Sequence, residues 1–295
     1  MRNGRHRTIG VIAFLATILT AACGDSGSAG DAPAPPVATD VSFEPGTTMA
    51  ALNAAQRIRV GTKFDQPLFG LLGLDGQMAG FDIEIAKLIA AELGIPASNI
   101  QWVEAPSPVR EELLEQGTVD IVVATYTIND RRRERVSFAG PYYIAGQDLM
   151  VRAGDTSIGG PEDLRGTKRV CSVQGSTPSV NIREYVDERQ LTLFDVYSRC
   201  ADALRTNQVD VVTTDNVVLM GLIEASNGAF ELVGKPFTVE PYGIGIRKGD
   251  VAFCEFINDV LRRAAESGRY QEAWARTAGT VAGPAPELPE PQPCS

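Results

Sequence analysis

Histidine is almost absent from the chain, which has one, His6, among 295 residues. A basic start, an uncharged run from Thr8 to Ala22 and small residues before Cys23 predict a secretory signal peptide over residues 1–22 rather than a membrane span. Cleavage would remove His6. The remaining chain could not carry a catalytic site that needs imidazole, and it would lack the commonest transition-metal ligand. We therefore expect neither a metal site nor a cofactor.

Basic residues are fewer than acidic residues. The chain has 27 Lys and Arg against 37 Asp and Glu, which gives a formal net charge of −10. Loss of residues 1–22 would take away three arginines and no acid, and this changes the charge from −10 to −13. An acidic surface argues against nucleic acid or an anionic lipid surface as a partner.

The residues at the expected cleavage point, Leu19-Thr-Ala-Ala-Cys23, resemble a bacterial lipobox. The usual leucine three positions before the cysteine is Thr20 here. The resemblance implies that Cys23 is lipidated and that it anchors an exported protein to the outer face of the cytoplasmic membrane. The alternative is an ordinary signal peptide followed by an unrelated cysteine.

Low-complexity segments flank the central part of the chain. Residues 24 to about 45 are Gly-, Ser-, Ala-, Pro- and Asp-rich without apolar periodicity, which predicts a flexible tether over 23–46. The C-terminal segment 281–295 is similarly rich in Pro and Glu, and we expect a tail of the same kind there. The roughly 235 residues between the two are enough for two compact lobes or one large α/β domain.

The most informative stretch is 119–143. It opens with a β-branched apolar run, 119–123, that predicts a buried strand. The hydroxyl residues Thr125 and Thr127 follow, and an Asn-Asp pair then opens the segment 129–135, a predicted short capped helix with four arginines. Helix N–H groups, hydroxyls and guanidinium groups together suit a carboxylate. Such an arginine run is usually a solvated helix face, so we expect at most one or two arginines to point inward.

Two motifs carry a family resemblance. Ala124-Thr-Tyr-Thr-Ile-Asn-Asp-Arg-Arg132, followed by Phe138-Ala-Gly-Pro-Tyr-Tyr143, resembles the ligand-binding segment of the polar amino-acid binding proteins that serve ABC importers. The segment 80–93, Gly-Phe-Asp-Ile-Glu-Ile-Ala-Lys-Leu-Ile-Ala-Ala-Glu-Leu, predicts an amphipathic helix and resembles a signature of the same family. The resemblance implies that Thr127 and Arg132 hold the α-carboxylate of the ligand, with Thr125 beside them.

Predicted strands and helices alternate along the chain. The order βαβαβ over the first part predicts a parallel, doubly wound sheet, and a second such unit follows. The predicted strands are 58–63, 100–104, 119–123, 148–152, 168–172, 191–196, 210–213 and 241–249, and the main helices are 49–56, 80–93, 110–116, 199–206, 216–226, 251–267 and 270–278.

The family resemblance implies a periplasmic-binding-protein type II fold, an α/β fold in which two doubly wound lobes are joined by two hinge strands. The first lobe is then discontinuous, over 47–150 and 240–280, and the second covers 151–239. The hinge strands are expected near 148–154 and 237–246. A ligand would bind in the cleft between the lobes and close it.

The resemblance also implies ligand-binding residues in the second lobe. Gln174-Gly-Ser-Thr177 precedes a predicted helix whose free N–H groups could bind a carboxylate oxygen, which makes Thr177 a candidate. Asp215 matches the family's acid that pairs with the α-ammonium of the ligand. An aspartate at the start of a helix is ordinarily only a cap, and this is the alternative for Asp215.

Lys63 and Arg110 are the candidate specificity residues. In the glutamate and aspartate binders of the family, a basic residue after the first strand and an arginine at the start of a later helix hold the distal carboxylate. Their Asn-Arg-x-Pro pattern is Val109-Arg-Glu-Glu112 here. Binders of neutral amino acids need no such cations, because a buried cation without an anion is costly. The alternative is that both are surface side chains with their charges in water.

These resemblances imply a binding protein, not an enzyme, that captures an amino acid and delivers it to an ABC permease. Glutamate is the expected ligand, with aspartate and the two amides as further candidates, and we expect a monomer. Two alternatives stay open. One is a sensor that reports ligand occupancy to a membrane partner, and the other is a periplasmic dehydratase on the same fold, which would need a buried general acid facing the cleft.

Five cysteines in an exported chain leave four if Cys23 is lipidated, and four cysteines allow three pairings. Pairing Cys171 with Cys200 and Cys254 with Cys294 keeps each bridge within one expected lobe and holds the C-terminal tail. A bridge between the lobes would oppose hinge motion. Free buried thiols are the alternative, which an oxidising compartment disfavours.

Overall fold

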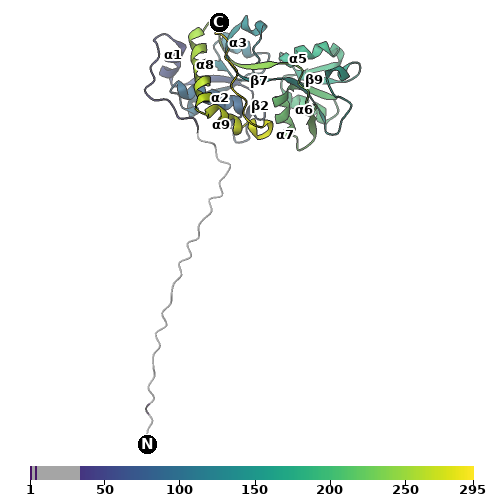
Figure 1. Cartoon of the computed structure of the whole chain (residues 1–295), viewed down its shortest axis with the longest axis horizontal. Coiled ribbons are helices and arrows are strands. Elements are labelled where there is room, and N and C mark those ends of the chain that lie inside the picture. Colours follow the sequence, from purple (N-terminus) through teal and green to yellow (C-terminus); the bar gives the residue numbers. More distant parts are fainter. Residues whose placement is uncertain (2–3, 5–33) are drawn as a thin grey trace. The chain divides into compact units, whose positions relative to one another are not determined.

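Two five-stranded sheets organise the chain (Figure 1). The structure is a computed structural model that describes Met1, Gly4 and residues 34–295. Cys23 and nearly all of the predicted signal peptide lie outside the described residues, so the lipid anchor stays a prediction. Residues 34–295 form one unit, which contains both sheets.

The first sheet has the strand order β5-β1-β6-β13-β7. β1, β5 and β6 are parallel and come from the predicted βαβαβ segment, whereas β13 is antiparallel to both β6 and β7. Since β13 follows the second sheet along the chain, the first lobe is built from two separate segments. The strands are β1 (Ile58–Thr62), β5 (Ile100–Glu104), β6 (Ile121–Val122), β7 (Val136–Ala145) and β13 (Glu240–Arg247).

The second sheet repeats this arrangement with the order β10-β9-β11-β8-β12. β9, β10 and β11 are parallel, and β8 is antiparallel to its two neighbours. Each sheet is therefore mixed, because the strands next to the interlobe crossings add antiparallel pairs to the predicted parallel unit. The strands are β8 (Gln147–Arg152), β9 (Val170–Val173), β10 (Leu191–Phe194), β11 (Val211–Asp215) and β12 (Phe230–Leu232).

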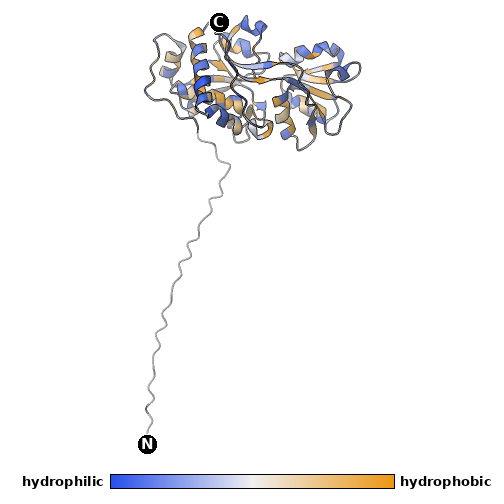
Figure 2. Cartoon of the chain, viewed as in Figure 1, coloured by the Kyte–Doolittle hydropathy of each residue, from blue (hydrophilic) through white to orange (hydrophobic). Residues whose placement is uncertain are grey.

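Helices cover the sheets and bury their apolar sides on them. On α8, Phe253, Ile257 and Leu261 recur every four residues and are buried, and Figure 2 shows this helix with orange and blue residues alternating. The helices of the first lobe are α1 (Thr48–Ala55), α2 (Phe81–Glu92), α3 (Arg110–Glu115), α4 (Asp130–Arg133), α8 (Val251–Glu266), α9 (Arg269–Ala275) and α10 (Gly279–Ala282). Those of the second lobe are α5 (Thr177–Asn181), α6 (Tyr197–Arg205) and α7 (Asn216–Glu224).

Several short elements were not predicted. A three-stranded sheet precedes α2 and consists of β2 (Asp65–Gln66), β3 (Gly70–Leu72) and β4 (Met78–Ala79). Short 3-10 helices span Ala97–Asn99, Pro161–Leu164, Ile182–Glu184 and Glu188–Gln190. Within residues 34–295, no helix combines the length and the apolar character needed to cross a membrane.

The chain crosses between the lobes twice. β7 and β8 meet at Gly146, so the second sheet begins before the predicted boundary at residue 150. The return crossing is the segment 233–239, between β12 and β13. A Cβ on Gly146 would lie 2.8 Å from Pro236 Cβ and 2.9 Å from the Thr238 oxygen. The two crossings therefore run so close together that this position requires glycine.

The fold starts earlier than the predicted tether allows. The Ala38 N–H donates to the Ala91 carbonyl over 2.9 Å, and the Phe43 ring lies 5.6 Å from that of Phe256. Residues 38–46 are thus packed on the first lobe. The prediction of a flexible tether up to residue 46 is wrong for this part, because a backbone hydrogen bond and an aromatic contact hold a segment of polar composition on the lobe.

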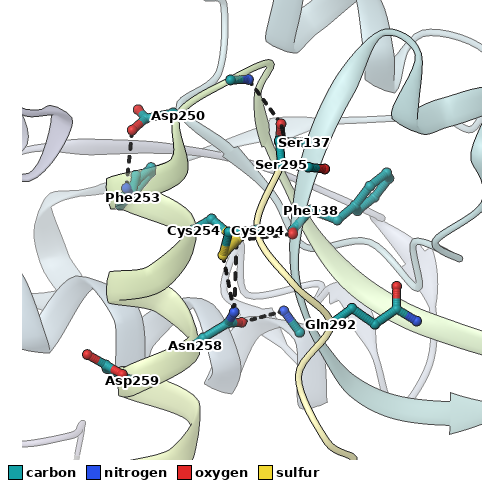
Figure 3. Close-up of a disulfide and its surroundings, with 12 residues drawn as sticks. Ser137, Phe138, Asp250, Phe253, Cys254, Asn258, Asp259, Gln292, Cys294 and Ser295 are labelled. Carbon is teal, nitrogen blue, oxygen red and sulfur yellow. Dashed lines mark hydrogen bonds between the residues drawn. A yellow bond between two sulfur atoms is a disulfide. The ribbon is translucent and has the colours of Figure 1, made fainter.

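The C-terminal segment is also docked on the first lobe (Figure 3). The Trp274 Nε1–H donates to the Gly283 carbonyl over 2.9 Å, and the Gln292 N–H donates to the Gly140 carbonyl over 2.7 Å. Leu288 packs against the main apolar cluster of this lobe. The segment is therefore held on the lobe, as the predicted bridge between Cys254 and Cys294 implied, and it differs from the N-terminal tether that its composition resembles.

Both predicted disulfides are present, and each lies within one lobe. Cys171 and Cys200 join β9 to α6, with their Cα atoms 5.6 Å apart. Cys254 and Cys294 join α8 to the C-terminal segment, with their Cα atoms 5.8 Å apart. Neither bridge restricts the crossings between the lobes.

Candidate functional site

A small polar cavity lies between the two lobes and is lined by residues from both. Lys63 and Arg132 are not in its wall but lie directly behind it, in contact with Ser107 and Thr127 respectively. The other predicted ligand-binding residues all line the cavity: Arg110, Thr125, Thr127, Thr177 and Asp215. The structure thus brings the predicted site residues of both lobes together.

Arg132 is held in place by the start of α4. The side-chain oxygen of Asn129 accepts a hydrogen bond from the Arg132 N–H over 2.9 Å, which caps this short helix as predicted. Of the four arginines in the segment 131–135, Arg132 is the buried one, with 6% of its surface exposed. The expectation that at most one or two of them point inward is confirmed.

The Arg132 guanidinium spans both lobes. It donates to the Thr127 carbonyl over 2.6 Å and, across the cavity edge, to the Gly175 carbonyl over 3.3 Å. Its Nε lies 3.4 Å from a carboxylate oxygen of Glu111. Burial, followed by the neighbouring charge of Arg110, lowers the pKa of Arg132 to about 10, so the side chain remains a cation at neutral pH.

Lys63 and Arg110 are buried cations, with 3% and 2% of their surfaces exposed, so the surface alternative is wrong. Lys63 Nζ lies 3.0 Å from Ser107 Oγ, and Arg110 donates to the Ala124 carbonyl over 2.8 Å. Neither forms an ion pair with any described residue, and Arg110 Nε has no hydrogen-bond partner among them. Burial, followed by the charge of Arg110, lowers the pKa of Lys63 to about 7.

The Tyr126 ring holds the two guanidinium groups. The guanidinium carbons of Arg110 and Arg132 lie 4.2 and 5.0 Å from its centroid. An aromatic face attracts cations and limits how far they can rotate. Tyr126 therefore orients both arginines without lining the cavity itself.

Asp215 stands at the N-cap position of α7 but makes no capping hydrogen bond. One of its oxygens accepts a bond from the Tyr242 hydroxyl over 2.6 Å, and the other has no partner within the described ranges. Burial, followed by the charge of Glu240, raises the pKa of Asp215 to about 7. The alternative of a simple helix cap therefore does not hold. An unpaired carboxylate oxygen in a cavity wall is suited to a cationic group of a ligand.

Asp82, an acidic residue of the family-like segment 80–93, holds the backbone of Thr125 in place. Thr125 has a left-handed backbone, with φ 46°, and its N–H donates to Asp82 over 2.8 Å. The Thr125 hydroxyl donates to Gln66 over 3.0 Å. Burial raises the pKa of Asp82 to about 6, although bonds from the Tyr142 hydroxyl and the Thr125 N–H oppose this. The motif helix α2 thus positions a cavity residue.

Thr177 connects the lobes and the return crossing. Its hydroxyl lies 3.2 Å from the Thr127 hydroxyl of the first lobe and 2.7 Å from a carboxylate oxygen of Glu240. Glu240 is buried at the start of β13 and also accepts a bond from Asn181 over 3.0 Å. Polar contacts at the cavity therefore extend directly to the strand that joins the lobes.

Six further lining residues were not predicted from the sequence. Ser176, Pro178 and Thr214 adjoin predicted site residues, so their neighbours in sequence were a usable signal. The other three come from β2, the loop before α3 and the start of α6, which only the folded chain brings to the cavity, and no sequence pattern marked them. The missed lining residues are Gln66, Ser107, Ser176, Pro178, Tyr197 and Thr214.

The cavity is lined by hydroxyls and charges rather than by metal ligands. Among residues 34–295 and the two described near the N-terminus, no three His, Cys, Asp or Glu side chains are grouped to hold a metal ion. Three cations, Lys63, Arg110 and Arg132, lie on the side of the first lobe, and Asp215 lies on the second. This distribution suits a small solute that carries both negatively and positively charged groups.

The family described as bacterial extracellular solute-binding proteins, family 3, matches residues 58–279. The chain belongs to this family. It is therefore a solute-binding protein rather than an enzyme, and the two-lobe type II fold that the sequence predicted is confirmed.

Similar proteins include two curated binding proteins and a solved structure. The chain is 38% identical over 270 residues to the ABC transporter glutamine-binding protein GlnH of Bacillus subtilis, covering 91% of this chain and 95% of that one. It is 38% identical over 268 residues to the glutamate-binding protein GluB of Corynebacterium efficiens, covering 88% and 85%. The solute receptor for L-cysteine of Neisseria gonorrhoeae has a TM-score of 0.75 at 26% identity, covering 83% of this chain and all of that one.

Proposed function

We propose that the protein is an exported, lipid-anchored receptor that captures an acidic amino acid, above all glutamate, between its lobes and delivers it to the permease of an ABC importer. The observation that carries this proposal is the pair of buried cations without acid partners, Lys63 and Arg110, next to the cavity. Burying two like charges is costly unless an anion joins them. The distal carboxylate of glutamate supplies that anion.

The rest of the ligand is matched by the remaining site residues. Arg132, Thr127 and Thr177 are proposed to bind the α-carboxylate, because the Thr127 and Thr177 hydroxyls lie 3.2 Å apart in the cavity wall and the Arg132 guanidinium lies directly behind them, on the Thr127 carbonyl. Asp215 is proposed to bind the α-ammonium through its unpaired oxygen. Thr125, held by Asp82, contributes a further hydroxyl to the same wall.

Similarity to known binding proteins does not distinguish glutamate from glutamine as the ligand. The chain is 38% identical both to a protein named for glutamine and to one named for glutamate. The choice between acid and amide therefore depends on the charges at the cavity, which favour the acid.

The anchor is proposed from the sequence around Cys23. The segment 24–33 would then separate the lipid from the folded part, which begins near Ala38. A Cys23→Ala variant expressed in the native host should be recovered without lipid and outside the membrane fraction. Membrane recovery of that variant in an unchanged amount would contradict the anchor.

Calorimetric titration of the purified protein with all twenty amino acids tests the ligand. Glutamate should bind more tightly than glutamine by one or two charge-assisted contacts, about 1.5–3 kcal/mol each. Glutamine binding as tightly as glutamate would overturn the acidic specificity. Binding of none of the twenty would overturn amino-acid capture itself. Glutamate uptake by cells with and without the gene then tests delivery to a permease.

A further inference from the structure

The lobes make a second contact outside the cavity, where α7 of the second lobe meets the residues after β2 of the first (Figure 1). Gly221 is buried in the middle of α7. A Cβ added to it would lie 2.4 Å from the carbonyl oxygen of Pro67, 3.1 Å from its carbonyl carbon and 3.3 Å from its Cβ. The backbone of one lobe thus touches the bare helix surface of the other.

No requirement within the second lobe explains this glycine. Gly221 has the ordinary backbone of a helix, and all three of the atoms nearest to its missing Cβ belong to Pro67. Alanine stabilises a helix more than glycine does. The glycine therefore lowers the stability of α7 and allows a close approach between the lobes.

Neighbouring residues extend the contact on both sides. An Asp65 carboxylate oxygen accepts a hydrogen bond from the Ser198 N–H over 3.2 Å, at the start of α6. Val217, one turn before Gly221, is buried in the apolar cluster of the first lobe. Pro67 therefore lies against α7 as part of a continuous interlobe surface.

The same elements lead to the ligand. Asp215 immediately precedes α7, and Gln66 immediately precedes Pro67, and both line the cavity. The distance between these two walls is consequently tied to how closely Pro67 and Gly221 approach. A Cβ at the contact would force a shift there, and this shift would move the walls apart.

We infer that Gly221 is a positioning residue, whose missing side chain lets the lobes close far enough for both cavity walls to reach one ligand. This rests on the proposed capture of an amino acid between the lobes. Gly221 does not line the cavity. It affects ligand affinity only by setting how closely the two lobes approach each other in the closed state.

The test is Gly221→Ala in the otherwise complete protein, titrated with glutamate and measured by stopped-flow dissociation and small-angle scattering. Affinity should fall about tenfold, the equivalent of overpacking one tight contact, with a matching rise in the dissociation rate. The glutamate-saturated variant should have a larger radius of gyration than the saturated wild type. Its melting temperature without ligand should be unchanged or higher, because alanine favours the helix.

Gly159→Ala is the matched control, since it adds a methyl group to the second lobe at ordinary distances, 3.5 Å from Asp163 and 3.8 Å from Lys235. It should leave affinity and closure unchanged. Affinity of Gly221→Ala within about threefold of wild type would overturn the inference. A lowered melting temperature without ligand would also overturn it, because the damage would then lie within the lobe. Should wild type bind no amino acid, the proposed function fails first, and the inference fails with it.

Discussion

Three charged side chains at the cavity carry the proposed choice of ligand. Lys63 and Arg110 are buried side by side, and burial together with their mutual repulsion lowers the pKa of Lys63 to about 7. The charged form of Asp215 is disfavoured as well, because burial and the charge of Glu240 raise its pKa to about 7. The ammonium of an acidic amino acid would stabilise ionised Asp215, and its distal carboxylate would stabilise the charges of Lys63 and Arg110. These interactions would contribute to the binding free energy.

Replacing Lys63 and Arg110 together should weaken the binding of glutamate more than the binding of glutamine. The double variant Lys63→Met, Arg110→Met should lose most of its glutamate affinity, about 1.5–3 kcal/mol for each lost charge-assisted contact, measured by calorimetry. Glutamine should lose less, because an amide interacts more weakly with a cation. Stability without ligand should hold or rise, because two buried charges are removed.

The exposed pair Arg131 and Lys235 provides the control for that experiment. Changing both to Met removes the same two charge types without touching the cavity, so both ligands should bind as before. Equal losses for glutamate and glutamine in the cavity variant would refute the role of Lys63 and Arg110 in specificity.

The pH dependence of affinity should differ between the two ligands. Asp215 must be ionised to hold the ammonium, so binding strengthens as pH rises through its pKa of about 7. Lys63 must be protonated to hold the distal carboxylate, so this contribution is lost as pH rises through its pKa of about 7. Glutamate affinity should therefore peak near neutrality and fall by up to about tenfold per pH unit on either side. Glutamine affinity should rise and then level off.

Titrations across this range, with each ligand, check the two profiles. The Lys63→Met variant should give glutamate the same rising profile as glutamine, which identifies the group responsible for the alkaline limb. A wild-type glutamate profile that is flat on the alkaline side would contradict the assignment of Lys63.

The residues that sequence could identify are those within a recognisable motif. Thr127, Arg132 and Asp215 stand where the family resemblance placed them, beside the cavity. Tyr126 is within the first motif too, but its role depends on two arginines stacking on one ring. Gln66 reaches the cavity only because β2 folds back over it. Such contacts depend on tertiary structure, which a linear pattern does not contain.

At the scale of elements, locally determined helices were predicted closely. The segment 80–93 became α2 (Phe81–Glu92), because its apolar face repeats at helical spacing. β7 (Val136–Ala145) was not predicted as a strand, since Gly140 and Pro141 interrupt its strand signal. Its extended form is stabilised by pairing with β13, which lies about a hundred residues later in the chain. Distant pairing of this kind overrides local propensity.

The C-terminal segment gives a prediction at this scale. The Cys254–Cys294 bridge closes a loop of 40 residues, and the Cα atoms lie within the first lobe. Replacing both cysteines by alanine should lower the free energy of unfolding by about 2–4 kcal/mol, chiefly by freeing the unfolded chain. Glutamate affinity should stay close to wild type, because the bridge is remote from the cavity residues.

Denaturant titration in the absence of reductant measures that loss. Trp274 fluorescence should report release of the segment, because its indole N–H bonds to the Gly283 carbonyl. The matched control is Cys171→Ala with Cys200→Ala, which removes the bridge of the second lobe and leaves Trp274 unaffected. Unchanged stability in the first variant would mean that packing alone holds the segment.

At the scale of the molecule, two thin crossings connect lobes that each contain their own apolar clusters. The apolar clusters on the two sides of Gly146 are separate, apart from Val217, which is buried in a cluster of the first lobe. The interlobe contacts include polar ones at the cavity, such as Arg132 with Gly175 and Tyr242 with Asp215, and the partly apolar surface around Gly221. Such an interface favours opening and closing about the crossings rather than a fixed arrangement.

Ligand should therefore make the protein more compact. Lys63, Arg110 and Arg132 all lie on the first lobe, so closing the second lobe over them without an anion takes three like charges further from water, which is costly. Bound glutamate would supply two carboxylates to these cations and so favour the closed state. Small-angle scattering should give a smaller radius of gyration with saturating glutamate than without it. The Lys63→Met, Arg110→Met variant should be more compact than wild type in the absence of ligand, because two of these charges are gone. If wild type keeps one radius of gyration with and without ligand while the variant matches it, the unpaired cations do not hold the lobes open, and closure is already complete before glutamate binds.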